Sequence, residues 1–114
     1  MKKLLKKGKG KMIINLSGEL TIFNIGKIRE ALLDALEDSP VVELKFGRIN
    51  ALDLSFIQLL HSAHLTAIER KKNLVVHGGE LPELVKKFST RTGFDRTSAF
   101  FADYCNLSVQ GNQG

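Results

Sequence analysis

The chain has 114 residues, of which 43% are hydrophobic and 25% charged, and its formal net charge is +5. This length fits one domain with a single core, and no apolar run approaches the roughly 18 residues that span a bilayer. The single cysteine, Cys105, excludes a disulfide framework. One unpaired thiol is typical of a reducing compartment, so we expect a cytoplasmic protein.

The positive charge is concentrated at one end of the chain. Six of the 17 basic residues are lysines within residues 1–11, and the rest of the chain has 11 basic and 12 acidic residues. We therefore predict a basic disordered tail over residues 1–11, a single domain over residues 12–109 and a disordered end over residues 110–114. The near-neutral body indicates no nucleic-acid partner. The tail lacks the apolar core of a signal peptide, and its lysines favour at most a weak contact with a membrane surface, without insertion.

The first half of the domain alternates between strand and helix patterns. Residues 12–16 are short, apolar and partly β-branched, which predicts a strand that ends at Ser17-Gly18, and residues 19–22 predict a second short strand. Apolar residues then recur at helical spacing over residues 25–37. Asn24 is positioned to cap this helix, and Pro40 ends it.

The second half repeats the alternation. Residues 41–46 predict a strand, residues 47–50 a turn, and residues 55–71 a helix whose apolar stripe includes Phe56. Residues 74–77 predict another strand, and a short helix follows Pro82. Four aromatic residues indicate that the C-terminal segment folds back on the core: Phe94, Phe100, Phe101 and Tyr104.

Strands that alternate with helices are typical of an α/β fold with a largely parallel sheet. Parallel neighbours need crossover connections, and each predicted helix is long enough to provide one. We therefore expect helices packed against a sheet.

Three local patterns in this order resemble a STAS domain, the fold of anti-sigma-factor antagonists and of the cytoplasmic tails of sulfate-transporter-type carriers. They lie at residues 16–20, at residues 49–55, and at residues 74–79 with the short helix that ends at Thr92-Gly93-Phe94. The resemblance covers residues 12–96. It implies a four- to five-stranded mixed sheet with helices packed against it, and a regulatory module rather than an enzyme.

The family's switch is a loop that resembles Asp-Ser-Ser-Gly, in which a partner kinase phosphorylates the second serine. Asp53 matches the aspartate and Ser55 matches the phosphorylated serine. Leu54, Phe56 and Gln58 depart from the pattern and make the loop more apolar. The resemblance therefore implies phosphorylation at Ser55 and a partner-binding surface around it, made of Asp53, Leu54, Ser55, Phe56, Gln58, Ser62 and Leu65.

The residues themselves leave a second interpretation of this segment open. Ser55 and Gln58 have the spacing of a capping box, in which the serine accepts a hydrogen bond from a backbone N–H three residues later. Asp53 is an alternative cap for the same helix. A serine at a helix start is therefore either a phosphate acceptor or a structural cap, and the two roles are compatible before modification.

Other chemistry-bearing residues predict no catalytic, cofactor or metal site. His61 and His64 are three residues apart, which is not the spacing of a helical zinc pair, and His77 ends a strand. Cys105 has no basic neighbour in the sequence that would lower its pKa. Gly78-Gly79 lacks the remaining residues of a phosphate-binding loop and is interpreted as a turn.

Three hypotheses of function follow. The first is a non-enzymatic interaction module that an anti-sigma-type serine kinase, or a larger signalling complex, switches through Ser55. The second is a constitutive adaptor subunit of a chemotaxis or membrane lipid or anion transport complex, which uses the same surface without phosphorylation. The third, a small enzyme or nucleotide-binding protein, lacks a phosphate-binding motif and a paired acid and base.

Overall fold

A computed structural model describes residues 5–8 and 10–105 of the chain. Within these residues, four strands make one sheet in the order β1-β2-β3-β4. The elements in chain order are β1 Leu5–Gly8, β2 Lys11–Leu20, α1 Ile25–Asp38, β3 Val41–Leu52, α2 Leu54–Glu69, β4 Asn73–Val76, the short 3-10 turn η1 His77–Gly79, α3 Glu83–Thr92, α4 Phe94–Thr97 and α5 Ala99–Cys105.

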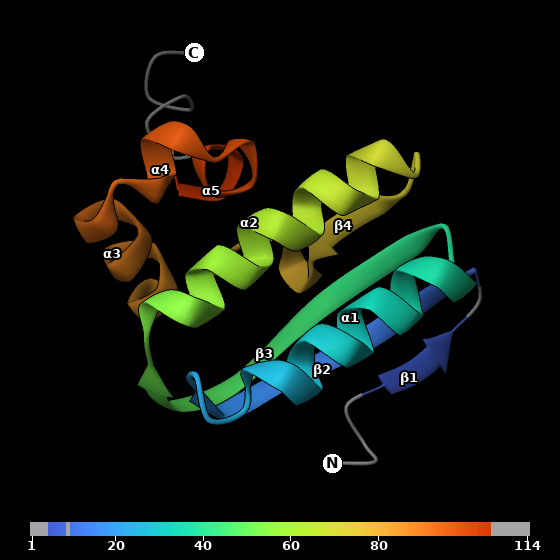
Figure 1. The fold of residues 1–114 in the computed structure, drawn as a ribbon, viewed down its shortest axis with the longest axis horizontal. Coiled ribbons are helices and arrows are strands. Elements are labelled where there is room, and N and C mark those ends of the chain that lie inside the picture. The colour runs from blue at the N-terminus through green and yellow to red at the C-terminus, as the bar shows by residue number, and fades with distance from the viewer. Residues whose placement is uncertain (1–4, 9, 106–114) are drawn as a thin grey trace.

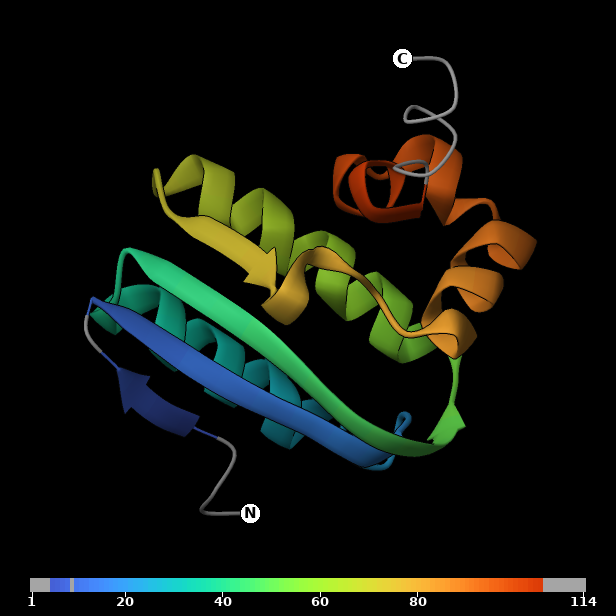
Figure 2. The ribbon, with the colours of Figure 1, turned by 180° about the vertical axis from the view of Figure 1, so that it is seen from behind.

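The sheet is mixed, because β1 pairs antiparallel with β2 whereas β2, β3 and β4 are parallel. Helices α1 and α2 connect the parallel strands, and both lie on the same face of the sheet (Figures 1 and 2). Successive crossovers that step in one direction across a sheet place their helices on one side, since both have the same hand. The predicted α/β fold with helices packed against a mixed sheet is confirmed.

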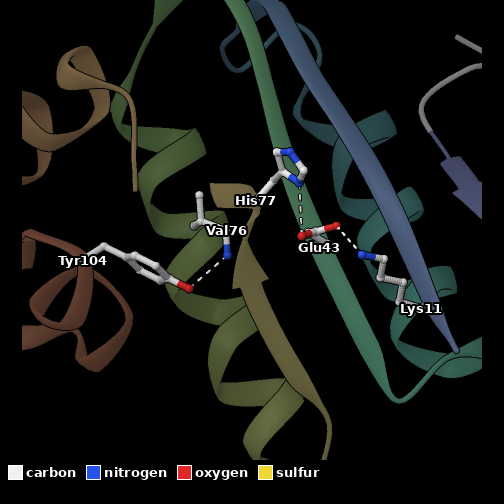
Figure 3. A network of polar contacts seen from close by, with 5 residues as sticks. All are labelled: Lys11, Glu43, Val76, His77 and Tyr104. Atoms are coloured by element: carbon white, nitrogen blue, oxygen red, sulfur yellow. Dashed lines mark hydrogen bonds and ion pairs between the residues drawn. The ribbon is translucent and has the colours of Figure 1, made fainter. Parts of the chain in front are cut away.

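The core lies between the sheet and these two helices. Residues buried in β2, β3 and β4 alternate along each strand, as in Met12, Ile14 and Leu16, so one face of the sheet is buried in the core. The opposite face carries polar side chains among half-buried apolar ones. There Glu43 pairs with Lys11 at 3.1 Å and with His77 at 3.2 Å (Figure 3). The Lys11 ammonium, helped by His77 and opposed by burial, holds the pKa of Glu43 below its ordinary value.

Strands β2 and β3 are longer than the sequence pattern predicts. The strands predicted over residues 12–16 and 19–22 are one strand as far as Leu20, whereas residues 21 and 22 lie in the turn that follows. The pairing of β2 with β3 changes register at Gly18, which has a φ of 77°. A glycine with positive φ absorbs an extra residue as a bulge instead of ending the strand. The turn predicted at residues 47–50 is likewise part of β3. Pairing with β4 ends at Leu44, so β2 and β3 continue as a two-stranded ribbon.

The prediction of a disordered tail is wrong for residues 5–8, which form β1 and pair with β2, and for Lys11, which begins β2. Residues 1–4 and 9 of that tail, and the predicted disordered end at residues 110–114, lie outside the described residues. No helix in the described part of the chain is both long and apolar enough to cross a membrane.

The C-terminal helices pack back onto the core, as the aromatic residues predict. Phe100 and Phe101 of α5 are buried and contact each other edge to face, with ring centres 5.2 Å apart. The hydroxyl of Tyr104 accepts a hydrogen bond from the backbone N–H of Val76 at 2.9 Å (Figure 3). This bond satisfies a backbone donor on the outer edge of β4, which is the last strand of the sheet in the described part of the chain.

Candidate functional site

Helix α2 begins directly after β3, and Asp53 caps it. Asp53 has an extended backbone, and its Oδ1 accepts a hydrogen bond from the backbone N–H of Ser55 at 3.0 Å. This is the geometry of an N-cap, in which a side-chain oxygen satisfies one of the free N–H groups of the first turn. The cap of α2 is therefore Asp53, one of the two candidates that the sequence offers.

Ser55 lies inside the first turn of α2 and does not cap the helix. Its backbone N–H is the group that Asp53 caps, and its Oγ–H donates to Oδ1 of Asp53 at 2.5 Å. The capping-box interpretation of Ser55 and Gln58 is therefore wrong. The reason is that α2 begins at Leu54, one residue earlier than predicted. The hydroxyl of Ser55 is half-buried, and the helix start does not depend on it.

The second carboxylate oxygen of Asp53 reaches a different part of the chain. Oδ2 accepts a hydrogen bond from the backbone N–H of Ile22 at 2.9 Å, and the N–H of Asp53 donates to the carbonyl of Leu20 at 3.3 Å. Ile22 belongs to the turn over residues 21–24, which connects β2 with α1. One carboxylate therefore joins this turn to the start of α2.

Asn24 occupies the N-cap position of α1 but makes no side-chain capping bond. Its side-chain amide instead donates to the carbonyl of Glu19 at 2.8 Å. The predicted side-chain cap is thus replaced by a bond that closes the turn over residues 21–24.

The contacts of Asp53 favour its ionised form. Partial burial by itself raises the pKa of the carboxyl. The Ser55 hydroxyl and the backbone N–H groups of Ile22, Ser55 and Phe56 outweigh burial and lower the pKa below its ordinary value. The site therefore presents a fixed negative charge at neutral pH.

Apolar side chains are exposed in the two segments that Asp53 joins, which are helix α2 and the turn over residues 21–24. Along α2, Leu54, Leu65 and Ile68 are 40%, 52% and 57% exposed, and Gln58 and Ser62 are exposed on the same side of the helix. In the turn over residues 21–24, Ile22 is 59% and Phe23 is 87% exposed. Leu54 and Leu65 lie at the surface as predicted.

The predicted surface does not include this turn, because the sequence pattern assigns Ile22 to a strand. Two large apolar residues directly before a helix cap are the signal that could have identified it. We define the α2 surface as Ile22, Phe23, Asp53, Leu54, Ser55, Gln58, Ser62, Leu65 and Ile68.

Phe56 belongs to the core and not to this surface. Its side chain is completely buried and packs edge to face against Phe46 of β3, with ring centres 6.2 Å apart. This burial removes Phe56 from the predicted partner-binding set. Its role is to hold the first turn of α2 against the sheet.

The three histidines have separate surroundings. His61 Nδ1 lies 2.8 Å from the Ser98 hydroxyl, His77 pairs with Glu43, and His64 packs against Phe100 with ring centres 5.5 Å apart. Among the described residues, no group of three or more His, Cys, Asp and Glu is arranged to hold a metal ion. The side chain of Cys105 lies outside the described part.

A groove of about 440 Å³ lies between α2, β4 and α5, with His64, Ile68, Leu74 and Phe100 among its lining. Burial lowers the pKa of His64, while the nearby Asp103 carboxylate acts in the opposite direction. The groove is on the C-terminal half of α2, and it contains none of the predicted site residues.

Comparisons with known proteins identify the family. A family model described as "Mlab, STAS domain" matches residues 5–102, so the chain belongs to the STAS domain family. Among solved structures, the anti-sigma factor antagonist SpoIIAA in its unphosphorylated form is similar, with a TM-score of 0.63 and 19% sequence identity over 78% of each chain. At this identity the likeness establishes the fold. No curated protein sequence matches the chain significantly.

Proposed function

We propose that the chain is a non-enzymatic regulatory module of the anti-sigma factor antagonist type, and that a partner serine kinase switches it by phosphorylating Ser55. The observation that carries this proposal is the environment of the Ser55 hydroxyl. It lies in the first turn of α2, is bonded to Asp53 and is not used as the helix cap. Apolar side chains that a partner can cover are exposed beside it.

Phosphorylation changes this surface in two opposing ways. The free N–H groups and the dipole of a helix start favour a phosphate. The phosphate also adds a charge of about −1.5 to −2 next to the ionised Asp53. The surface around it exposes the apolar side chains of Leu54 and Phe23. A partner that buries the unmodified surface must then desolvate this charge, which opposes binding.

The kind of partner follows from the chemistry of the switch. A protein that recognises Ser55 both as a contact and as a phosphate acceptor is a serine kinase of the anti-sigma type, or a signalling complex that contains one. We expect this encounter to take place in the cytoplasm, where a lone cysteine is stable in reduced form. Weak contact of the lysine-rich segment with a membrane surface stays a prediction.

Binding measurements on two Ser55 variants test the proposal. Ser55→Asp adds a negative charge at the switch, and Ser55→Ala removes the acceptor and leaves the Asp53 cap in place. Calorimetry with the co-purified partner should show that Asp lowers the affinity about tenfold or more, whereas Ala binds nearly as the unmodified chain does. Thr90→Asp, on the exposed surface of α3, is the charge-matched control. Equal affinities of the Asp and Ala variants would refute the switch.

A constitutive adaptor in a chemotaxis or membrane transport complex is the second candidate. The exposure of Ile22, Phe23, Leu65 and Ile68 favours it, because an apolar contact needs no phosphate. Phe56 does not contribute to such a contact, since its side chain is buried. An adaptor predicts that Leu65→Asp abolishes binding while Ser55→Asp leaves it unchanged. The switch predicts that both variants bind weakly.

A further inference from the structure

The two oxygens of the Asp53 carboxylate hold two different segments. Oδ1 accepts hydrogen bonds from the N–H and the hydroxyl of Ser55, and Oδ2 accepts from the N–H of Ile22. Ile22 and Ser55 are far apart in the chain, and a single side chain fixes one relative to the other. A change at Oδ1 therefore acts on the group that holds the turn over residues 21–24.

This turn carries the most exposed large apolar side chain of the described residues, Phe23. Its internal bonds run from the N–H of Asn24 to the carbonyl of Thr21 at 2.9 Å and from the N–H of Phe23 to the Thr21 hydroxyl at 3.4 Å. These bonds shape the turn but do not attach it to α2. The bond between Ile22 and Asp53 provides that attachment.

We propose that Asp53 is a positioning residue that couples the state of Ser55 to this turn, so that phosphorylation releases Phe23 as well as adding charge. This inference rests on the proposed switch and adds a second effect of phosphorylation, the release of Phe23. The partner is a protein with an apolar pocket for the Phe23 ring beside its contact with Ser55. Phosphorylation therefore removes an apolar anchor from the α2 surface.

The chemistry of the modification supports the coupling. The Ser55 oxygen attacks the γ-phosphorus of a nucleoside triphosphate supplied by the kinase, a new O–P bond forms, and the bond to the departing nucleoside diphosphate breaks. The hydroxyl proton passes to a base supplied by the kinase, so the serine oxygen has no hydrogen left to donate to Oδ1. Asp53 loses one donor and gains a neighbouring anion. Rotation of the carboxylate away from that anion breaks the bond to Ile22.

A protein pocket fits this surface better than a bilayer does. The carboxylate of Asp53 lies 2.9 Å from the Ile22 nitrogen, so insertion of Phe23 into lipid would carry an ionised group into the interface. In a protein complex the same carboxylate stays hydrogen-bonded at the rim while the ring is buried. Aromatic side chains in such pockets commonly dominate binding energy.

Backbone dynamics of the turn test the coupling directly. We would measure ¹⁵N order parameters for Ile22 and Phe23 in the unmodified chain, in a chain with phosphoserine encoded at position 55, and in Asp53→Asn. Asparagine still caps α2, but only one of its terminal atoms is an acceptor, so it cannot serve both segments. The order parameters should fall from about 0.85 toward 0.6 in both altered chains. Phosphoserine encoded at position 90 should leave them unchanged.

Unchanged order parameters at Ile22 and Phe23 in the chain phosphorylated at position 55 would overturn the coupling. If that chain also fails to bind the partner, the proposed switch stands and acts by charge alone. If the turn loosens but the partner binds both forms equally, the coupling is supported and the proposed switch fails. The two ideas are therefore separable.

The role of Phe23 is tested with Phe23→Ala and Phe23→Trp. Because Phe23 is 87% exposed, neither change disturbs the core. Phe23→Ala should weaken partner binding about tenfold or more. The chain has no tryptophan, so Phe23→Trp is a unique fluorescent reporter, and its emission should shift to shorter wavelength on binding the partner. A shift with phosphatidylglycerol vesicles and none with the partner would overturn the assignment to a protein pocket.

Discussion

Replacement of Asp53 should destabilise the fold in two separable steps. Asp53→Ala removes both the cap of α2 and the bond to Ile22, whereas Asp53→Asn keeps a cap and removes the bond. A lost N-cap costs about 1 kcal/mol. A hydrogen bond to a charged group is worth roughly 1.5 kcal/mol at the low end of its range, and the half-exposed position of Asp53 reduces this to about 1 kcal/mol. We therefore expect losses of about 2 kcal/mol for Ala and about 1 kcal/mol for Asn.

Urea unfolding measures these losses. With a slope of about 1.5 kcal/mol per molar urea, the midpoint should fall by roughly 1.3 M for Asp53→Ala and by about half of that for Asp53→Asn, with the slope unchanged. Asp34→Ala removes a carboxylate from an exposed position of α1 and is the matched control. If Asp53→Asn is as stable as the unmodified chain, the second hydrogen bond contributes nothing and the argument for a bridging carboxylate fails.

The same comparison has a defined pH dependence. The folded-state pKa of Asp53 lies below its ordinary value of 3.8. The unfolded state therefore takes up the proton first, and the stabilisation is present above pH 3.8 and is lost as the pH falls through the folded-state pKa. The difference in unfolding free energy between the unmodified chain and Asp53→Asn should be constant near neutral pH and should shrink in strong acid. A difference that grows toward low pH would contradict the assigned ionised state.

Three further changes address the fold around the site. Phe56→Ala should cost about 3–5 kcal/mol of unfolding free energy, because the buried ring leaves a cavity against Phe46. Tyr104→Phe should cost about 1–3 kcal/mol, since it leaves the N–H of Val76 without its acceptor at the edge of β4. Burial lowers the pKa of His64 below 6.5, so the unmodified chain should lose stability as the pH falls below 6.5. His64→Gln should lack that loss, and both profiles are measurable by urea unfolding.

The sequence pattern predicts the alternating elements well because α1, α2 and β4 each bury one regular stripe. The sequence pattern fails where one type of residue is compatible with two different local structures. Ser17-Gly18 is a good turn, but a glycine with positive φ serves equally well as a bulge inside a long strand. The choice depends on whether β3 offers pairing partners further along, which is a property of the assembled sheet. The lysine-rich segment fails for the same reason, since its charges do not reveal that residues 5–8 pair with β2.

At the candidate site, prediction from the sequence fails for a different reason. Phe56 lies on the apolar stripe of its helix, which indicates the core, while the resemblance to the family's loop placed it at the partner surface. The apolar stripe predicts the position of Phe56 correctly, because the free energy gained by burying its phenyl ring outweighs the match to the family's loop. Ser55 and Asp53 were both acceptable caps, and only the starting residue of α2 distinguishes them. The bond from Ile22 to Asp53 joins residues 31 apart in the chain and has no local signature.

The narrowing of the sheet has a consequence for how the molecule opens. Beyond Leu44, β3 pairs with β2 alone, and this two-stranded end leads directly to Asp53 and α2. Elements with fewer neighbours open at a lower free energy than the rest of a domain. Amide hydrogens over residues 45–52 should therefore exchange with solvent by partial opening, well before those over residues 41–44, where β3 lies between β2 and β4. The end of the molecule proposed to meet the partner is thus a separate cooperative unit, which a partner can stabilise or release at less than the cost of global unfolding.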